Sequence, residues 1–439
     1  MEKNLHIPEL ESANFPLLVA EGTIFVTALT FISYSTVLPA FVSSLTASSV
    51  LVGLVSATRS TGWFLPQLFA ANYLEREPLK KPILLRTSFA SRFSMLLMAT
   101  ITYFWGASHP GLILALFFVL YLLFNLFESV SALAWIDITA KTVRPTRRGS
   151  LFSIMQALGS LMGLGVGFLI RMILSHPNLS PPRNYAMVFF AAFIVLVVNY
   201  GVLLMLKEPP GEVVQEKRSF QDYLKSMPAL FRKNDAFKKV AIVRILVSFT
   251  FMVIPFYVVY SRQIIISGAG IIGIYVLLQT SGMMLGSLIF GRLSDRVGNR
   301  SVLIGTALGT FLLPVLALTV YFLSLQGQVP MMTYLYAVIF VGIGFSESGQ
   351  WIGFTNYVLE ISSEAERPSY YGLLNALSIV SAILPIVGGL LVARFGYELL
   401  FWIAASFLLA AFIFSLRLPE PRRISSLGAD MASDSTEKA

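Results

Sequence analysis

Residues 291–300 read Gly-Arg-Leu-Ser-Asp-Arg-Val-Gly-Asn-Arg, and a degenerate copy, Ala-Asn-Tyr-Leu-Glu-Arg-Glu-Pro-Leu-Lys, occupies residues 71–80. The charged positions of the two copies align without a gap: Glu75 with Asp295, Arg76 with Arg296 and Lys80 with Arg300. Glycines in the preceding segments align in the same register: Gly53 with Gly273 and Gly62 with Gly282. A chain whose second half repeats its first is expected to fold as two similar units facing each other.

The composition is that of a membrane protein. The chain has 439 residues, of which 56% are hydrophobic and only 13% are charged, whereas about a quarter of the residues of a soluble protein are charged. The apolar residues fall in blocks long enough to cross a bilayer as helices. The sequence therefore predicts an all-α membrane protein with twelve transmembrane helices, near residues 15–42, 49–72, 85–105, 112–136, 149–173, 185–206, 240–261, 269–291, 302–325, 331–357, 370–394 and 398–417.

Several kinds of chemistry are not expected. The chain has no cysteine, so it has no disulfide, thiolate metal site or thiol nucleophile. Its three histidines, His6, His109 and His176, fall outside the predicted spans, which argues against an imidazole metal or catalytic centre in the membrane. No segment resembles a nucleotide-binding loop. We therefore expect no cofactor, no metal and no enzymatic activity.

The net charge of +9 reflects membrane sidedness rather than nucleic-acid binding. If the N-terminus is cytoplasmic, the cytoplasmic segments hold most of the 32 Lys and Arg residues. The outside loops then hold only Arg171, Arg183, Arg262 and Arg394. This asymmetry predicts a multi-pass protein of the inner or plasma membrane with both termini in the cytoplasm.

The charged segment between the sixth and seventh spans divides the chain. We predict an N-terminal six-helix half at 1–206 and a C-terminal six-helix half at 240–418. Between them, 207–239 is a cytoplasmic linker in which apolar residues at helical spacing predict an amphipathic helix on the membrane surface. The small, polar residues of 419–439 predict a disordered cytoplasmic tail.

A second repeat has nearly the same offset as the first. Residues 144–149, Arg-Pro-Thr-Arg-Arg-Gly, match residues 367–372, Arg-Pro-Ser-Tyr-Tyr-Gly. Both stretches lie in short cytoplasmic loops, before the fifth and the eleventh spans. Two signatures at nearly one offset support the duplication more strongly than either does alone.

Together these motifs resemble the major facilitator superfamily of transporters. The loop signature of that family is met by Gly291, Leu293, Ser294, Asp295, Arg296, Gly298 and Arg300, whereas the first copy has Ala71, Pro78 and Glu75 in place of the family residues. The segment around the eleventh span fits through Arg367, Gly372, Pro385, Gly388 and Gly389. The resemblance covers the whole chain and implies two pseudo-symmetric six-helix bundles that rock around a central site.

The loop signature has a physical interpretation. A carboxylate at the end of one helix can face the N-terminus of a neighbouring helix and its basic residues, and so latch one face of the protein shut. The alternative is that these charges only anchor the loops at the level of the lipid headgroups. The predicted gating latch comprises Glu75, Arg76, Lys80, Gly291, Asp295, Arg296, Gly298 and Arg300.

Charges inside the membrane are costly, at about 2.5–3.5 kcal/mol each on insertion scales, so each one needs an explanation. The first, fourth, seventh and tenth spans each contain one: Glu21, Glu128, Arg244 and Glu347. The resemblance implies that these four spans line the central cavity. With Arg59 of the second span and Trp351 of the tenth, they form the predicted substrate and proton cavity.

Each of these residues has two interpretations. A partly desolvated carboxylate, Glu128 or Glu347, can load and release a proton near neutral pH. The alternative is a structural ion pair, such as Glu128 with Arg92 or Glu21 with Arg244. Arg59 can hold an anionic group of a substrate or pair with a carboxylate of the cavity. Trp351 can stack on a flat substrate or pack between helices.

The prediction is a secondary transporter that moves a small solute by alternating access and is coupled to protons. A greasy cavity with few charges favours export of amphipathic compounds, whereas the arginines favour uptake or exchange of a small anionic or polar metabolite. A third possibility is a membrane sensor or assembly factor that has a carrier fold but transports nothing. The expected partners are a small-molecule substrate, protons and the lipid bilayer, and the sequence does not indicate an oligomeric state.

Overall fold

The computed structural model describes residues 7–74, 77–211, 231, 234–264, 268–326, 329–362, 370, 373–374, 377–378 and 380–421. Within these ranges the chain is helical and contains no β-strand. Eight of the described helical segments are long and apolar enough to cross a membrane. Three predicted features lie outside the described residues: most of the amphipathic helix of the linker, the loop residues Glu75 and Arg76, and the tail beyond Pro421.

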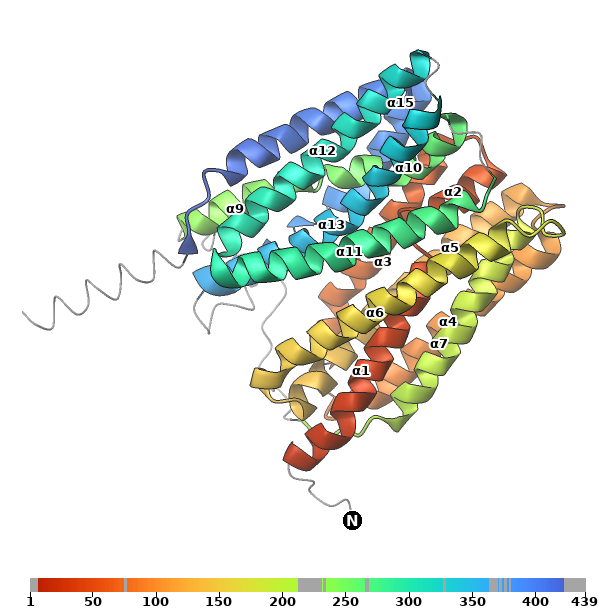
Figure 1. The fold of residues 1–439 in the computed structure, drawn as a ribbon. Helices are drawn as coiled ribbons and strands as arrows, with labels where there is room; N and C mark the ends of the chain where they lie inside the picture. Colours follow the sequence, from red (N-terminus) through yellow and green to blue (C-terminus); the bar gives the residue numbers. More distant parts are fainter. Residues whose placement is uncertain are drawn as a thin grey trace, which may run out of the picture.

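The N-terminal half contains seven helices, coloured red to yellow-green in Figure 1: α1 (Ile7–Phe31), α2 (Val37–Leu45), α3 (Ser49–Leu74), α4 (Lys81–Trp105), α5 (Pro110–Thr142), α6 (Pro145–Leu174) and α7 (Arg183–Met205). Proline occupies the first turn of α4, α5 and α6. At that position proline sacrifices no helical hydrogen bond and its fixed φ suits a helix start. These local signals begin three helices where the apolar blocks predict them.

The described helices of the C-terminal half are α9 (Asp235–Val247), α10 (Thr250–Ile264), α11 (Ile271–Arg296), α12 (Asn299–Leu325), α13 (Val329–Ile361) and α15 (Val380–Ser415). The helix α15 contains the eleventh and twelfth spans, separated at Gly396, whose φ of 83° is favourable only for glycine. The first span of each half is broken in two, into α1 and α2 and into α9 and α10. With these breaks, the helices follow the twelve predicted spans.

The repeated glycines lie at equivalent helix contacts in the two halves. A Cβ atom at Gly53 of α3 would overlap the backbone of Pro385 in α15, and one at Gly273 of α11 would overlap the backbone of α6. Deeper in the same helices, Gly62 faces α5 and Gly282 faces α13. Because only glycine lets these backbones approach so closely, the duplicated positions are the ones where packing requires it.

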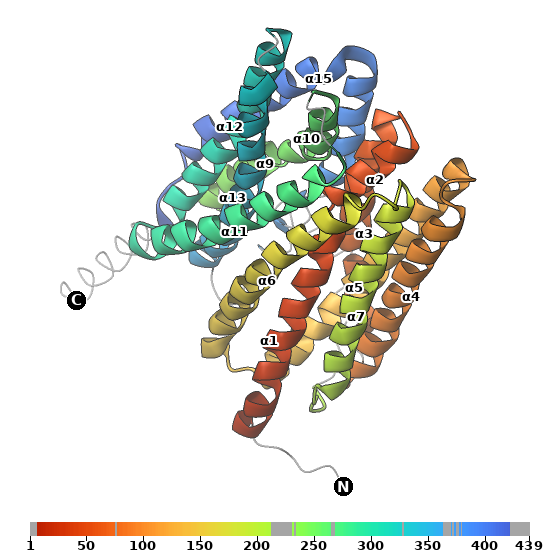
Figure 2. The same ribbon diagram turned by 45° about the vertical axis from the view of Figure 1, so that its right-hand side comes forward.

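The two bundles meet at one end and separate at the other. Figures 1 and 2 show them close together around α2 and α10 and apart toward the end where α1 begins and α15 ends. One apolar cluster contains residues of both halves, such as Phe41 and Phe256. Two other clusters each belong to a single half, one around Leu18 and Ile138 and the other around Tyr357. We call the end where the bundles meet, around α2 and α10, the closed end, and the opposite end the open end.

Backbone contacts hold the closed end together. The α3–α15 and α6–α11 pairs make the main contacts between the halves, and Gly389 of α15 lies against the backbone of Ser49 and Val50. Arg262 at the end of α10 donates to the carbonyl oxygen of Ala40 in α2, at 3.3 Å. These contacts join the two halves at the closed end.

Candidate functional site

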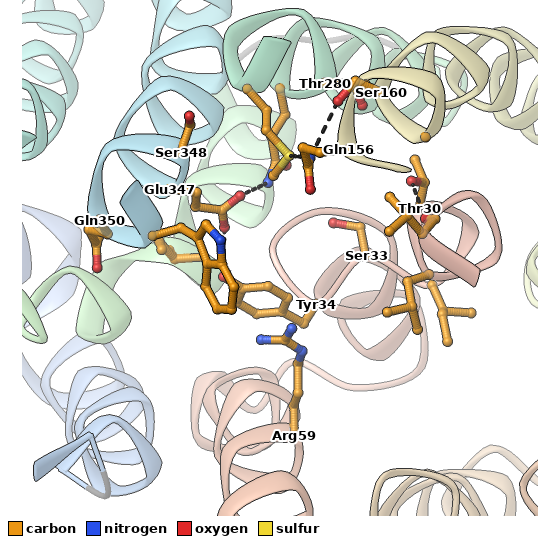
Figure 3. A pocket seen from close by; sticks show the side chains of 18 of the residues that line it. Thr30, Ser33, Tyr34, Arg59, Gln156, Ser160, Thr280, Glu347, Ser348 and Gln350 are labelled. Carbon is orange, nitrogen blue, oxygen red and sulfur yellow. Dashed lines mark hydrogen bonds between the residues drawn. The ribbon is translucent and has the colours of Figure 1, made fainter. Parts of the chain in front are cut away.

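A cavity of about 440 Å³ lies between the two halves. Its wall is formed by α1, α3, α5 and α6 of the N-terminal half and by α9, α10, α11 and α13 of the C-terminal half. Its size is within the range of small-molecule sites, about 300–1,000 Å³. Figure 3 shows its polar side chains, with Tyr34, Arg59 and Glu347 directed toward one another.

Glu347 of α13 connects the halves through hydrogen bonds. Its Oε1 accepts from the hydroxyl of Tyr34 at 2.7 Å, and its Oε2 accepts from the amide of Gln279 at 3.1 Å. Tyr34 belongs to the turn between α1 and α2, whereas Gln279 belongs to α11. Gln279 in turn accepts from Ser35 at 2.9 Å. Two hydrogen bonds therefore cross from the N-terminal to the C-terminal half around one carboxylate.

Arg59 of α3 lies beside this network, close enough for its charge to act on the Glu347 carboxylate. The guanidinium carbon is 4.1 Å from the centre of the Tyr34 ring, a cation–π contact. Among the described residues Arg59 makes no ion pair and no hydrogen bond. Its aligned position in the second half is Gln279, so the duplicated site holds a cation on one side and a neutral amide on the other.

Arg244 and Trp351 also line the cavity. Arg244 donates to the Ser378 hydroxyl at 2.9 Å and lies 4.8 Å from the ring centre of Phe354. Trp351 is 68% exposed and is one of the residues that line the cavity. Of the six residues predicted from sequence, the structure thus brings Arg59, Arg244, Glu347 and Trp351 to one cavity.

Glu21 and Glu128 do not line the cavity, and here the structure corrects the expected placement. Both are buried inside the N-terminal bundle. Glu128 accepts from Arg92 of α4 at 2.5 Å, and Arg92 also donates to Asn199 of α7. Asn199 donates to the Glu21 carboxylate at 3.0 Å. These carboxylates lie inside the bundle because Arg92 and Asn199 provide their hydrogen-bond donors where four helices meet. Glu21 does not take Arg244 as its partner.

The first copy of the predicted latch is organised by Glu208, which follows α7. Its carboxylate accepts from the backbone N–H groups of Lys80 and Lys81, at 2.8 and 2.6 Å, at the N-terminus of α4. Lys141 adds an ion pair at 3.0 Å. The Lys80 ammonium group donates to the carbonyl oxygens of Leu74 and Glu77. Within the described residues, this copy joins elements of the N-terminal half.

The second copy is likewise directed at its own half. Arg300 donates to the carbonyl oxygen of Leu416, just beyond α15, at 2.9 Å. Gly298 has a φ of 114° and lies directly against the carboxylate of Glu420. Asp295 and Arg296 are exposed at the open end, and a Cβ at Gly291 would meet nothing. The printed contacts of Lys80 and Arg300 thus each lie within one bundle.

The partners of the two loops form a third repeat that the sequence reading missed. Each half ends in Leu-x-Glu-Pro, at Leu206–Pro209 and at Leu418–Pro421. In each half, the glutamate carboxylate lies at the N-terminus of the helix that follows the loop signature, α4 or α12. A carboxylate there complements the free N–H groups and the helix dipole. The motif was visible, but its offset of 212 differs from the 220 of the loops.

A further cluster of ion pairs joins elements of the N-terminal bundle at the open end. Glu11, which is buried, accepts from Arg144 at 2.7 Å and from Arg147 at 2.8 Å. Arg144 and Arg147 belong to the repeated hexapeptide before the fifth span. The repeat marked these arginines, but nothing local in the sequence connects them to a glutamate 133 positions away.

The chain is similar to known transporters over nearly all its length. Residues 240–435 match the model of the Major Facilitator Superfamily, while no curated protein matches the sequence significantly. A mutant of the nucleoside transporter NupG is 14% identical with a TM-score of 0.70, over 93% of this chain and 99% of its own. A D-xylose-proton symporter is 16% identical with a TM-score of 0.69, over 94% and 99%.

A third solved structure is a bacterial homologue of the iron transporter ferroportin in an inward-facing state. It is 14% identical with a TM-score of 0.67, over 92% of this chain and 98% of its own. At such low identity these likenesses show the fold, and the family model adds the sequence signature of the second half. Residues 240–435 therefore match the Major Facilitator Superfamily by sequence, and the whole chain, with its duplicated loops and paired six-helix bundles, has the fold of these solved transporters.

Proposed function

We propose that the chain is a secondary transporter that carries a small organic solute by alternating access, with Glu347 as the group that binds the coupling proton. The observation that carries this proposal is the position of the Glu347 carboxylate. It lies in the cavity and accepts the Tyr34 hydroxyl across the boundary between the halves. A group that belongs to both the cavity and the contact between halves can link occupancy to rocking.

The conformation supports the same proposal. The basic segments that the sequence assigns to the cytoplasm, including Lys80, Lys141 and Arg144, lie at the open end. In our proposal the cavity therefore faces the cytoplasm in this state. To face outward, the molecule has to break the closed-end contacts, including those of Gly53 and Gly389, and close at the loops.

Protonation changes the strength of the connection. A hydrogen bond to an ionised carboxylate is roughly twice as strong as one between neutral groups. Binding a proton at Glu347 therefore weakens its attachment to Tyr34, so the proton and the solute act on the same contact. Glu128 is the less suitable proton carrier, since Arg92 holds it in an ion pair inside one bundle.

Reconstituted vesicles test the proposal. Proteoliposomes are loaded with a mixture of small organic metabolites, or incubated with it, under pH gradients of either sign, and contents are measured by mass spectrometry. We expect gradient-driven movement of at least one compound by wild type and a loss of at least tenfold in Glu347→Gln, which still exchanges that compound without a gradient.

The matched control is Glu9→Gln, which changes an exposed carboxylate at the start of α1 and is expected to behave like wild type. Gradient dependence that survives in Glu347→Gln contradicts the assignment of the proton site. Absence of movement under either gradient contradicts proton-coupled transport of these solutes.

A further inference from the structure

Arg59 is the arginine of the cavity whose guanidinium donors have no hydrogen-bond acceptor among the described residues. Arg244 is held by Ser378 and by the face of Phe354. Arg59 makes only the contact with the Tyr34 ring within the described part of the chain. A guanidinium in a membrane span is expensive to bury and is normally paired. An oxyanion of the solute would supply the missing partner, with the bidentate geometry that guanidinium favours.

The charged side chains in the described lining of the cavity are mostly arginines. Its described lining contains two arginines, Arg59 and Arg244, and one carboxylate, Glu347. Both oxygens of that carboxylate already accept hydrogen bonds, from Tyr34 and from Gln279. The two arginines therefore favour an anion in the cavity, while the neighbouring Glu347 carboxylate offsets part of the charge of Arg59.

Tyr34 brings the two charged groups together. Arg59 lies on the face of the Tyr34 ring, and the hydroxyl of the same ring is bonded to Glu347. An anion bound to Arg59 is therefore about one aromatic ring away from the Glu347 carboxylate. Like charges at this distance in a partly desolvated site repel, and the repulsion is relieved when Glu347 binds a proton.

We infer that the cavity takes a small organic anion whose carboxylate or phosphate pairs with Arg59, and that this anion and a proton on Glu347 bind cooperatively. The inference rests on the proposed transport function and specifies its substrate class. Linkage requires the effect to be reciprocal: the anion favours protonation, and low pH favours the anion.

Binding to the purified protein in detergent tests the inference separately from transport. The probes are matched sets of compounds that fit the cavity: benzoate, phenyl phosphate, benzamide and benzylamine, and succinate with succinamide. Affinities are measured by calorimetry and by ligand-dependent thermal stabilisation between pH 5.5 and 8. The variants are Arg59→Gln, Arg59→Lys and Glu347→Gln, with the exposed Arg394→Gln as control.

We expect at least one anion to bind, its neutral and cationic counterparts to bind at least tenfold more weakly, and Arg59→Gln to lose at least tenfold in affinity. Arg59→Lys should retain part of the affinity, and Arg394→Gln all of it. The wild-type affinity should fall as the pH rises, whereas Glu347→Gln should bind the anion with little pH dependence. If only the carboxylates bind, or only the phosphate, the result identifies which oxyanion pairs with Arg59.

Three results overturn the inference. One is that no anion of the set binds; another is that neutral or cationic members bind as tightly as the anions; the third is that Arg59→Gln binds like wild type. Vesicle transport distinguishes the two proposals. Gradient-driven movement of a neutral or cationic compound that is unaffected by Arg59→Gln removes the anion site and leaves proton-coupled transport intact. Anion binding without any transport removes the transport proposal and leaves the anion site intact.

Discussion

Removing Arg92 is the most informative perturbation of the fold. Arg92 donates to Glu128, to the Ser91 hydroxyl at 2.8 Å and to Asn199, and its side chain and that of Glu128 are each only 5% exposed. Arg92→Met preserves much of the apolar stem but leaves Glu128 as a buried carboxylate without its cation. Glu128 then has to bind a proton for the bundle to fold, since an unpaired charge there is too costly.

The expected loss of stability follows from the free energy needed to protonate that carboxylate. A glutamate with an ordinary pKa of about 4.3 in the unfolded state requires roughly 3.7 kcal/mol to be protonated at pH 7, and about 1 kcal/mol at pH 5. The folded variant binds the proton that the unfolded variant releases, so its stability falls as the pH rises. Arg92→Met should therefore lose about 4 kcal/mol at pH 7 and about 1 kcal/mol at pH 5 relative to wild type.

The assay is denaturant unfolding in mixed micelles at both pH values, with Arg92→Met, Glu128→Gln and the double variant. The double variant should regain most of the lost stability. It should also lose most of the added pH dependence, because no carboxylate remains at position 128. The exposed pair of Asp235 and Lys239, 3.0 Å apart, is the matched control and should contribute about 0–1 kcal/mol. A loss below about 1 kcal/mol at pH 7, or one independent of pH, would refute the reasoning.

Three other predictions concern helix contacts and the cavity. Gly53→Ala should push α3 away from α15 and increase the chemical labelling of residues at the closed end. Gly165→Ala, whose Cβ would meet nothing, should leave that labelling unchanged. Equal labelling of the two variants contradicts the closed-end assignment. Glu208→Ala should cost about 2 kcal/mol, because Lys80 and Lys81 lose their acceptor, and Glu208→Gln clearly less in the same unfolding assay. Trp351→Phe should remove a large share of the tryptophan fluorescence that aqueous acrylamide quenches, because the residue is 68% exposed and lines the cavity; unchanged quenching would place that ring away from the cavity.

Glu128 and Glu347 show where sequence reasoning about the site stopped. Both are glutamates in long apolar helices, with polar neighbours and a tryptophan a few residues later. The structure gives Glu128 an arginine of the same bundle and gives Glu347 a tyrosine of the opposite half. Partners separated by 36 and 313 positions leave no local trace in the chain. The two residues become distinguishable only when the helices are packed.

The gating signature illustrates the same limit. Its physical interpretation, a carboxylate facing a helix N-terminus, describes the structure well, but the carboxylates that do so in each half include Glu208 and Glu420. The sequence reading assigned that role to Asp295 and its aligned partner Glu75. The positions of the helix starts were predictable from proline and apolar periodicity, whereas the identity of the residue that reaches them depends on where distant loops return.

The sequence by itself determined the membrane-spanning helices, the duplication and the distribution of basic residues, because each is written in local composition or in alignment of the chain with itself. Hydrocarbon requires every span to satisfy its own backbone, so apolar length alone specifies the helices. Only the tertiary structure decided which intramembrane charges share a cavity and which neutralise each other inside a bundle. That choice depends on which faces of the helices meet, and buried charges take the partners that this packing brings within reach.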